Sequence, residues 1–142
     1  MSTRPSLTLQ RRLNASPAKV FRAWTQPAQI VKWMHASGNE MMHAEVDARE
    51  GGRFRLVMHG SDGAEHEASG RYLEVVADAK LVFTWSWRST PERESLVTVA
   101  LRPDGDGTLL TLTHEQFLDE ETRDQHTEGW TSTLDGLERY LA

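Results

Sequence analysis

Hydrophobic and polar residues alternate with a period of two through the middle of the chain, from about residue 41 to residue 114. Such alternation is typical of β-strands with one buried face, because successive side chains point to opposite sides of a sheet. Glycine- and aspartate-containing turns divide the alternating region into six segments. These segments are residues 41–49, 49–60, 65–76, 80–87, 94–103 and 107–115.

The predicted strands carry rows of apolar side chains on one face, which we expect to be the buried face. The clearest rows are Met42, Ala44 and Val46; Phe54, Leu56 and Met58; and Leu81, Phe83, Trp85 and Trp87. Residues 5–13 predict one further strand, with Leu7, Leu9 and, after a slip in the alternation, Leu13 on the same face. Consecutive strands joined by short turns favour an antiparallel sheet.

Two short helices are predicted directly after the first strand. Ser16 is a good N-cap, Pro17 suits the first position of a helix, and Pro27 marks a second helix start almost at once. A longer helix is expected at the C-terminus, with Asp119 as its cap. Its second half has apolar residues at helical spacing, namely Trp130, Leu134, Leu137 and Leu141.

This order of elements predicts an α+β fold. A sheet with one apolar face needs a cover, and the last helix is the longest that the sequence predicts. We therefore expect a curved antiparallel sheet of about seven strands that grips the C-terminal helix, with the two short helices after strand 1. One helix cannot fill the whole concave face, so a cavity between sheet and helix is expected, where ligand sites tend to lie.

Composition and charge narrow the class of protein. A length of 142 residues fits one domain over residues 1–142, and the absence of cysteine excludes a disulfide scaffold, a thiol nucleophile and a Cys-ligated zinc site. No signal peptide and no membrane-spanning apolar run is recognisable, so we expect a soluble, cytoplasmic protein with no membrane partner. A net charge of −5 argues against binding nucleic acid by neutralising its phosphates.

Five segments in order resemble a known family. They are SPAKVFRAWTQPAQIVKWM, GGRFR, GRYLEVVADAKLVFTW, VTVALRPDGDGTLLTLTHEQF and HTEGWTSTLDGLERYLA. Together they resemble the C-terminal domain of the activator of heat-shock protein 90 ATPase, within the START/SRPBCC helix-grip superfamily. The resemblance implies the helix-grip fold, and a stand-alone, bacterial-type relative among proteins that include small-molecule binders and some enzymes. The eukaryotic activators' separate N-terminal domain has no counterpart in these residues, and the family offers no universal catalytic triad to carry over.

The C-terminal helix contains an unusual juxtaposition, a glycine directly before its largest side chain. Gly129 precedes Trp130, although glycine inside a helix costs roughly 1 kcal/mol relative to alanine. The helix is polar from Glu120 to Glu128 and apolar from Trp130 onward. We therefore expect its first half either to project into water or to border a cavity, with His126 and Gly129 at the mouth and Gly129 leaving room for a ligand or a close strand.

The candidate ligand-binding residues are the inward aromatic and apolar side chains of the strands, with the polar groups of the last helix. Trp85 and Trp87 could form a stacking wall for a flat apolar ligand, whereas Trp24 and Trp33 suit the core. His114 continues the inward alternation and needs a buried partner. The full set is Trp33, Phe54, Leu56, Met58, Tyr72, Phe83, Trp85, Trp87, His114, His126, Gly129, Trp130 and Thr133.

The sequence supplies no recognisable catalytic, cofactor or metal motif. His59 and His66 flank a predicted hairpin loop near Glu65, but their spacing is not that of a preorganised metal site. Glu74 shares a predicted strand face with Tyr72, where a buried carboxyl group would have a raised pKa; a cross-strand ion pair with an arginine explains it equally well. We assign no catalytic residue, metal or cofactor.

Three functions remain open at this point. The first is a protein that binds a small hydrophobic ligand between the sheet and the last helix. The second is an enzyme acting on such a ligand, for instance by cyclisation, dehydration or hydrolysis, through His126, His114 or Glu74. The third is a co-chaperone or regulator, which the resemblance alone suggests. Whether the chain forms a homodimer also stays open.

Overall fold

The computed structural model describes residues 4–35 and 40–142, apart from the side chain of Met42, and confirms the expected fold. Seven antiparallel strands form one sheet in the order β1-β7-β6-β5-β4-β3-β2. The strands are β1 (Leu7–Leu13), β2 (Glu40–Val46), β3 (Arg53–His59), β4 (Glu65–Val76), β5 (Lys80–Trp87), β6 (Ser95–Asp104) and β7 (Gly107–Glu115). The helices are α1 (Pro17–Thr25), α2 (Pro27–Trp33) and α3 (Glu120–Tyr140).

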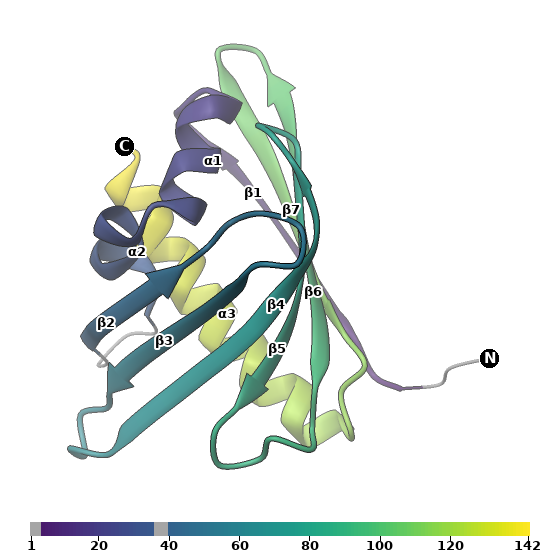
Figure 1. Ribbon diagram of the computed structural model, residues 1–142. Coiled ribbons are helices and arrows are strands. Elements are labelled where there is room, and N and C mark those ends of the chain that lie inside the picture. The colour runs from purple at the N-terminus through teal and green to yellow at the C-terminus, as the bar shows by residue number, and fades with distance from the viewer. Residues whose placement is uncertain (1–3, 36–39) are drawn as a thin grey trace.

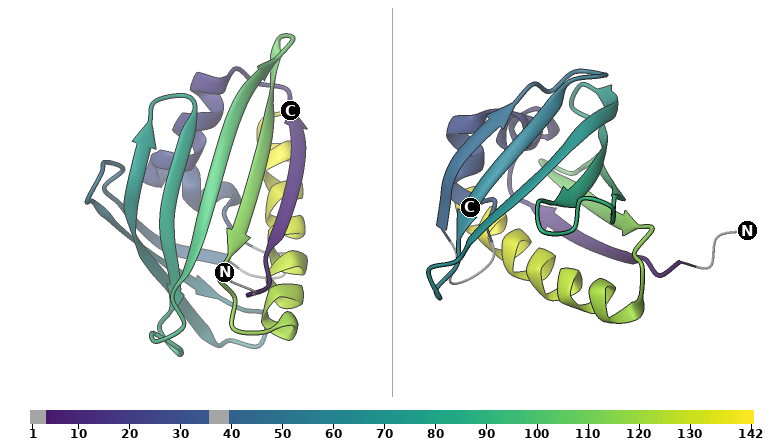
Figure 2. Two further views of the ribbon diagram at one scale, coloured as in Figure 1. Left: turned by 90° about the vertical axis from the view of Figure 1, so that its right-hand side faces the viewer. Right: turned by 60° about the horizontal axis from the view of Figure 1, so that its bottom comes forward.

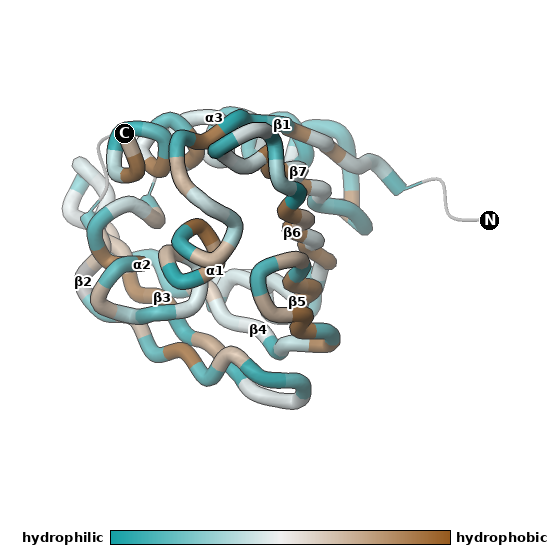
Figure 3. The backbone as a smooth tube through the Cα atoms, turned by 90° about the horizontal axis from the view of Figure 1, so that it is seen from above, coloured by the Kyte–Doolittle hydropathy of each residue, from teal (hydrophilic) through white to brown (hydrophobic). Residues whose placement is uncertain are grey.

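The sheet bends strongly around the long helix. Figure 1 shows α3 running behind the strands, with α1 and α2 near its C-terminal end. The rotated views show that α3 lies along the sheet at the side of β1 (Figure 2). Seen from above, the strands follow one another in an open ring from β1 round to β2, with α1 inside it (Figure 3).

Local signals set the helix boundaries, as the sequence predicts. The Ser16 side chain accepts a hydrogen bond from the Lys19 backbone N–H, and Pro17 is the first residue of α1. The Asp119 carboxylate accepts from the Thr122 backbone N–H at 2.8 Å, which satisfies one of the free donors at the start of α3. Hydrogen bonding from the Thr122 side chain, and then from its backbone N–H, keeps the pKa of Asp119 below its ordinary value.

The expected slip in the first strand does not occur. β1 pairs with β7 in unbroken register, so the alternation continues through Arg11. Arg11 lies on the side of the helix and contacts Asp135 at 3.2 Å and Glu138 at 3.8 Å on α3. The prediction was wrong because an arginine on an inward position breaks the hydrophobic pattern without breaking the strand.

A β-bulge changes the direction of one candidate residue. The pairing of β4 with β5 shifts between Tyr72 and Glu74, so that Val75 rather than Glu74 returns to the apolar face. Glu74 is thus placed on the outer face and pairs with Lys80 at 3.3 Å. The predicted shared face of Tyr72 and Glu74 is wrong, because a bulge adds one residue and reverses the alternation beyond it.

The core is one cluster of buried side chains inside the ring. Its most enclosed side chains come from α1, α2, the central strands and the second half of α3. They include Val20, Ile30, Trp33, Val97, Val99, Leu110, Leu112, Leu134 and Leu137. None of the helices in the described parts of the chain is both long and apolar enough to cross a membrane.

Candidate functional site

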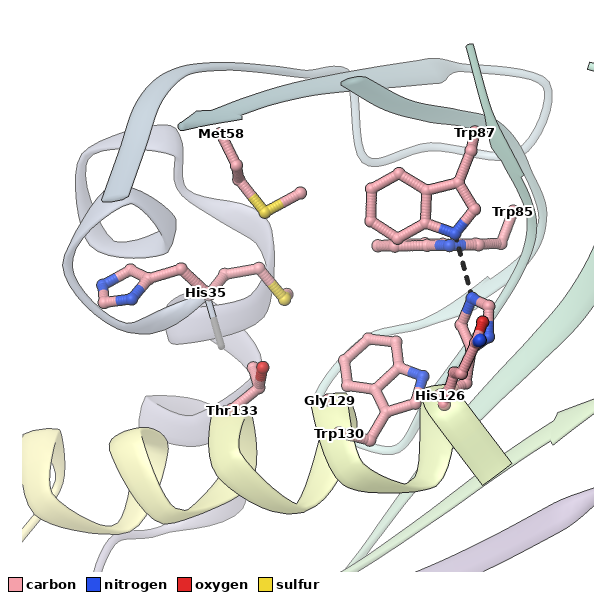
Figure 4. A pocket seen from close by; sticks show the side chains of 10 residues that line it. His35, Met58, Trp85, Trp87, His126, Gly129, Trp130 and Thr133 are labelled. Atoms are coloured by element: carbon pink, nitrogen blue, oxygen red, sulfur yellow. Dashed lines mark hydrogen bonds between the residues drawn. The ribbon is translucent and has the colours of Figure 1, made fainter. Parts of the chain in front are cut away.

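A cavity of about 270 Å³ lies where the first half of α3 faces the sheet. β3 and β5 form one wall, the end of α2 forms another, and α3 forms the floor in Figure 4. Its lining residues are Met34, His35, Met58, Trp85, Trp87, Gln125, His126, Gly129, Trp130 and Thr133. Most of them are apolar or aromatic, which is the usual character of a small-molecule site.

Gly129 opens the floor of this cavity. A Cβ atom built on Gly129 would meet no other atom within 4 Å, so the missing side chain leaves free space rather than room for a tightly packed neighbour. Trp130, the next residue, is buried and packs against Trp24 and Trp85. The glycine therefore lies at the point where α3 changes from bordering the cavity to packing in the core.

Three indole rings form the aromatic wall. Trp85 and Trp87 meet edge to face, with ring centroids 5.5 Å apart, and Trp85 and Trp130 are 5.4 Å apart. Aromatic pairs prefer such offset and edge-to-face arrangements. The wall is therefore held in shape by contacts among its own members, and it presents indole surface to the cavity (Figure 4).

His126 is fixed in one neutral form at the edge of this wall. Its Nδ1 lies 2.8 Å from the Thr122 carbonyl oxygen, which only accepts, so Nδ1 carries the proton. Its Nε2 accepts a hydrogen bond from the Trp87 indole N–H at 2.9 Å (Figure 4). Burial lowers the pKa of His126, partly offset by the bond to Thr122. A second proton on Nε2 would face the indole donor and break this bond.

His114 lies beneath the aromatic wall and does not line the cavity. It is fully buried, accepts a hydrogen bond from the Trp130 indole N–H at Nδ1, and contacts Ser95 Oγ through Nε2 at 2.6 Å. The Ser95 hydroxyl donates to the Trp85 carbonyl oxygen, so His114 Nε2 donates to Ser95. Burial, with a smaller contribution from His126, lowers the pKa of His114 to about 2. Ser95 and His114 resemble a serine–histidine dyad in composition. However, the histidine donates its proton to the serine instead of accepting the serine's proton, so the pair holds the structure together and does not activate the serine.

The structure brings seven of the thirteen predicted site residues to this cavity. These seven are Met58, Trp85, Trp87, His126, Gly129, Trp130 and Thr133. Phe54, Leu56, Tyr72 and Phe83 instead line a much smaller hollow of about 20 Å³, to which Met34 and Trp85 also belong. Trp33 lies in the core, where its indole N–H donates to the Ala23 carbonyl oxygen at 2.9 Å.

Three lining residues were not anticipated from the sequence. Met34 and His35 follow the last residue of α2, and Gln125 lies in the polar first half of α3. The polar stretch before Gly129 was a usable signal for Gln125, which precedes His126. No pattern in the sequence indicates that the end of α2 reaches this cavity, because that contact depends on how α2 packs against α3.

The other candidate polar groups do not assemble into a site. His59 and Glu65 face each other across β3 and β4 at 3.4 Å, both well exposed. Among the residues that the structure describes, no three His, Asp or Glu side chains come close enough to hold a metal ion.

Comparison with known proteins identifies the family. The model of the family described as "Activator of Hsp90 ATPase homolog 1-like protein" matches residues 14–142. The chain belongs to this family, abbreviated AHSA1. None of the curated proteins matches the sequence.

Solved structures of other proteins have the same fold. A protein of Chromobacterium violaceum superposes with a TM-score of 0.88 at 27% identity, over 96% of each chain. The AHSA1 protein of Silicibacter pomeroyi gives 0.86 at 29% identity, over 96% of this chain and 97% of that one. CalU16 of Micromonospora echinospora gives 0.75 at 29% identity, over 98% of this chain and 77% of that one.

This AHSA1-family chain also has an outer chamber beside the cavity. The chamber has a volume of about 300 Å³, is lined largely by polar residues of the segment after β5 and the start of α3, and shares four residues with the cavity. The shared residues are Trp85, Trp87, Gln125 and His126. The hydrogen bond between Trp87 and His126 therefore joins two side chains that border both spaces.

Proposed function

We propose that this AHSA1-family chain binds a small, mainly apolar aromatic ligand in the cavity between the sheet and α3. The observation that carries the proposal is the cavity itself, with three indoles, two methionines and a glycine that opens its floor. Its volume of about 270 Å³ lies just below the roughly 300–1,000 Å³ typical of small-molecule sites. A compound with a single aromatic ring or with two fused rings suits this space.

The composition of the wall favours a flat ring over an aliphatic chain. Indole faces offer large contact areas with little loss of side-chain entropy, and methionine side chains adapt to an irregular occupant. Trp85 and Trp87 are already held edge to face, and His126 fixes Trp87 from the helix. A preorganised wall of this kind reduces the entropy lost on binding.

We do not extend the proposal to catalysis. Of the residues considered for catalysis, His126 and His114 each use both ring nitrogens in hydrogen bonds, and Glu74 lies in an ion pair on the outer face. A general acid or base needs a proton or lone pair free to reach a ligand. Only the family description supports the co-chaperone hypothesis.

Gly129→Leu tests the proposal, with 2-methylnaphthalene as the probe in equilibrium dialysis. We expect the wild type to bind the probe and the variant to lose at least about tenfold in affinity, because the leucine occupies ligand space. The variant should nevertheless gain helix stability relative to glycine, by up to about 1 kcal/mol. Opposite changes in binding and stability exclude unfolding as the cause.

Glu128→Leu is the matched control, because Glu128 is exposed on the same helix, one residue away. It adds the same side chain outside the cavity and should leave binding unchanged. No binding of the probe by the wild type, or equal binding by wild type and Gly129→Leu, would contradict the proposal.

A further inference from the structure

The aromatic wall of the cavity leaves a ligand no free hydrogen-bonding atom. Trp87 and Trp130 donate their indole N–H groups to histidines, whose second ring nitrogens are also hydrogen-bonded. The Trp85 indole N–H has no partner among the described residues, but it is buried, so a ligand does not reach it. Polar groups of a ligand whose ring lies against this wall therefore need partners elsewhere.

The outer chamber supplies such partners. It lies where the turn after β5, the connection from β7 to α3 and the first turns of α3 meet. Four neutral polar residues line it and make no side-chain hydrogen bond to any residue that the structure describes, namely Ser89, Thr90, Gln116 and Gln125. Hydroxyl and amide groups can both donate and accept. The chamber can therefore hydrogen-bond a ligand at several points at once.

Gln116 lines this chamber in a strained backbone conformation. Its φ of 70° lies in the left-handed region, which a residue with a long side chain rarely adopts. Asp78, another non-glycine residue with a positive φ, lies in the turn between β4 and β5, and aspartate tolerates this region because its short side chain hydrogen-bonds locally. No hydrogen bond from the Gln116 side chain to a described residue offsets the cost. Strain of this kind is characteristic of ligand-binding sites, which favours a binding role for the chamber.

The charged residues of the chamber favour an uncharged ligand group that carries hydroxyls. Two arginines and two glutamates line the chamber, namely Arg4, Arg93, Glu92 and Glu94, so their charges cancel. A carboxylate only accepts hydrogen bonds and a guanidinium group only donates them, whereas a hydroxyl group does both through one oxygen atom. The carboxylates would repel an anion, and the guanidinium groups would repel an ammonium group.

We propose that the outer chamber binds an uncharged, polyhydroxylated substituent, such as a sugar ring, of the same ligand whose aromatic ring occupies the cavity. The inference rests on the proposed function, because it adds a second subsite for the same ligand. Trp87 and His126 line both spaces and are hydrogen-bonded to each other at the edge of the cavity (Figure 4). Gln125, which is exposed, also lines both spaces, and the link between ring and substituent passes the pair on this exposed side.

Three probes with the same aromatic ring measure what the chamber contributes. 2-Naphthyl β-D-glucopyranoside carries a sugar on the oxygen atom where 2-methoxynaphthalene carries a methyl group. We expect the wild type to bind the glucoside about tenfold more tightly, because the sugar forms hydrogen bonds in the chamber. 2-Naphthyl β-D-glucuronide, the charged analogue, should bind less tightly than the glucoside. Equilibrium dialysis measures all three affinities.

Two substitutions remove chamber groups without altering the lining of the cavity. Gln116→Gly and Thr90→Val should each weaken the glucoside about three- to fivefold and leave 2-methoxynaphthalene unchanged. Gln116→Gly should not lower the midpoint of urea denaturation, because glycine adopts a positive φ without strain. Asp78→Gly and Thr131→Val are the matched controls, because they make similar changes at residues that line neither space. Both should leave the affinities of both probes unchanged.

The outcomes separate this inference from the proposed function. The inference fails if the wild type binds the glucoside no more tightly than 2-methoxynaphthalene, or if the glucuronide binds as tightly as the glucoside or more so. It also fails if Gln116→Gly and Thr90→Val both keep the full advantage of the glucoside. The proposed function stands in each of these cases as long as 2-methoxynaphthalene binds to the wild type. Absence of that binding would instead remove the proposed function.

Discussion

At the scale of single residues, two histidine side chains each hold one indole ring of the aromatic wall in place. Trp130 donates to His114, and Trp87 donates to His126, so each of the two rings has its N–H bonded to a neutral histidine. An indole N–H can only donate, which requires the accepting nitrogen to be unprotonated. The geometry of the aromatic wall therefore depends on the protonation state of both histidines.

This dependence predicts that acid destabilises the fold in a defined range. Burial lowers the pKa of His114 to about 2 and lowers that of His126 as well, whereas an unfolded histidine titrates near 6.5. Below pH 6.5 the unfolded state therefore binds more protons than the folded state, and stability falls as the pH falls. Each histidine contributes a slope of up to about 1.4 kcal/mol per pH unit.

Urea denaturation between pH 7.5 and 5 measures this slope above the range in which most carboxylates titrate. His126→Gln removes one of the two titrating groups and should make the slope shallower. A free energy of unfolding that stays constant across this range would contradict the assignment of neutral, buried histidines.

At the scale of elements, the two halves of α3 lie in different environments. Its first half borders the cavity and the outer chamber, and its second half packs into the core through Leu134 and Leu137, both 0% exposed. The two halves should therefore respond oppositely to substitution by alanine.

We expect Leu134→Ala to lower the free energy of unfolding by about 2–5 kcal/mol, because it leaves a void in a close-packed region. Gly129→Ala should raise it by roughly 0.5–1 kcal/mol, because the new methyl group meets open space and alanine is the better helix former. Urea titrations of the two variants check the contrast. If Gly129→Ala does not raise the free energy of unfolding, the open space beside residue 129 is needed for the fold itself.

Most elements could be predicted because their signals are local. Alternation located the strands, and Ser16, Pro17 and Asp119 marked helix starts that the structure confirms. The bulge after Tyr72 escaped prediction because its strand pairing with β5, rather than any residue type, sets the change in alternation. Arg11 escaped because its partners lie more than a hundred residues away on α3.

The candidate site was harder to predict than the fold, for the same physical reason. Gly129 and His126 could be selected because both lie on one helix, whose periodicity places them on the same side. His35 could not, because it follows the end of α2 and reaches the cavity only when α2 packs against α3. The hydrogen bonds that fix the two histidine tautomers likewise join strands to helices across the core.

At the scale of the whole molecule, β1 and β2 are the two edge strands of the sheet, and they differ in the regularity of their pairing. β1 pairs with β7 along its whole length and is tied to α3 through Arg11, whereas β2 pairs with β3 through an irregular register. Unpaired edges open more readily than the centre of a sheet.

Hydrogen exchange should follow this arrangement. We expect the slowest exchange in β6 and β7, where Val97, Val99, Leu110 and Leu112 are at most 1% exposed, and faster exchange in β2. Mass spectrometry of peptic fragments resolves these strands. Protection of β2 equal to that of β6 would contradict the expectation.

The aromatic wall also has a spectroscopic consequence. Three of the five tryptophans in the chain border the cavity, and two of these donate their N–H to a histidine. Indole emission responds to the polarity and charge of its surroundings, so an occupant of the cavity or a proton on either imidazole must alter the natural fluorescence of the protein. The molecule thus carries its own optical reporter at the site, and ligands can be screened by their effect on its emission without attaching a label.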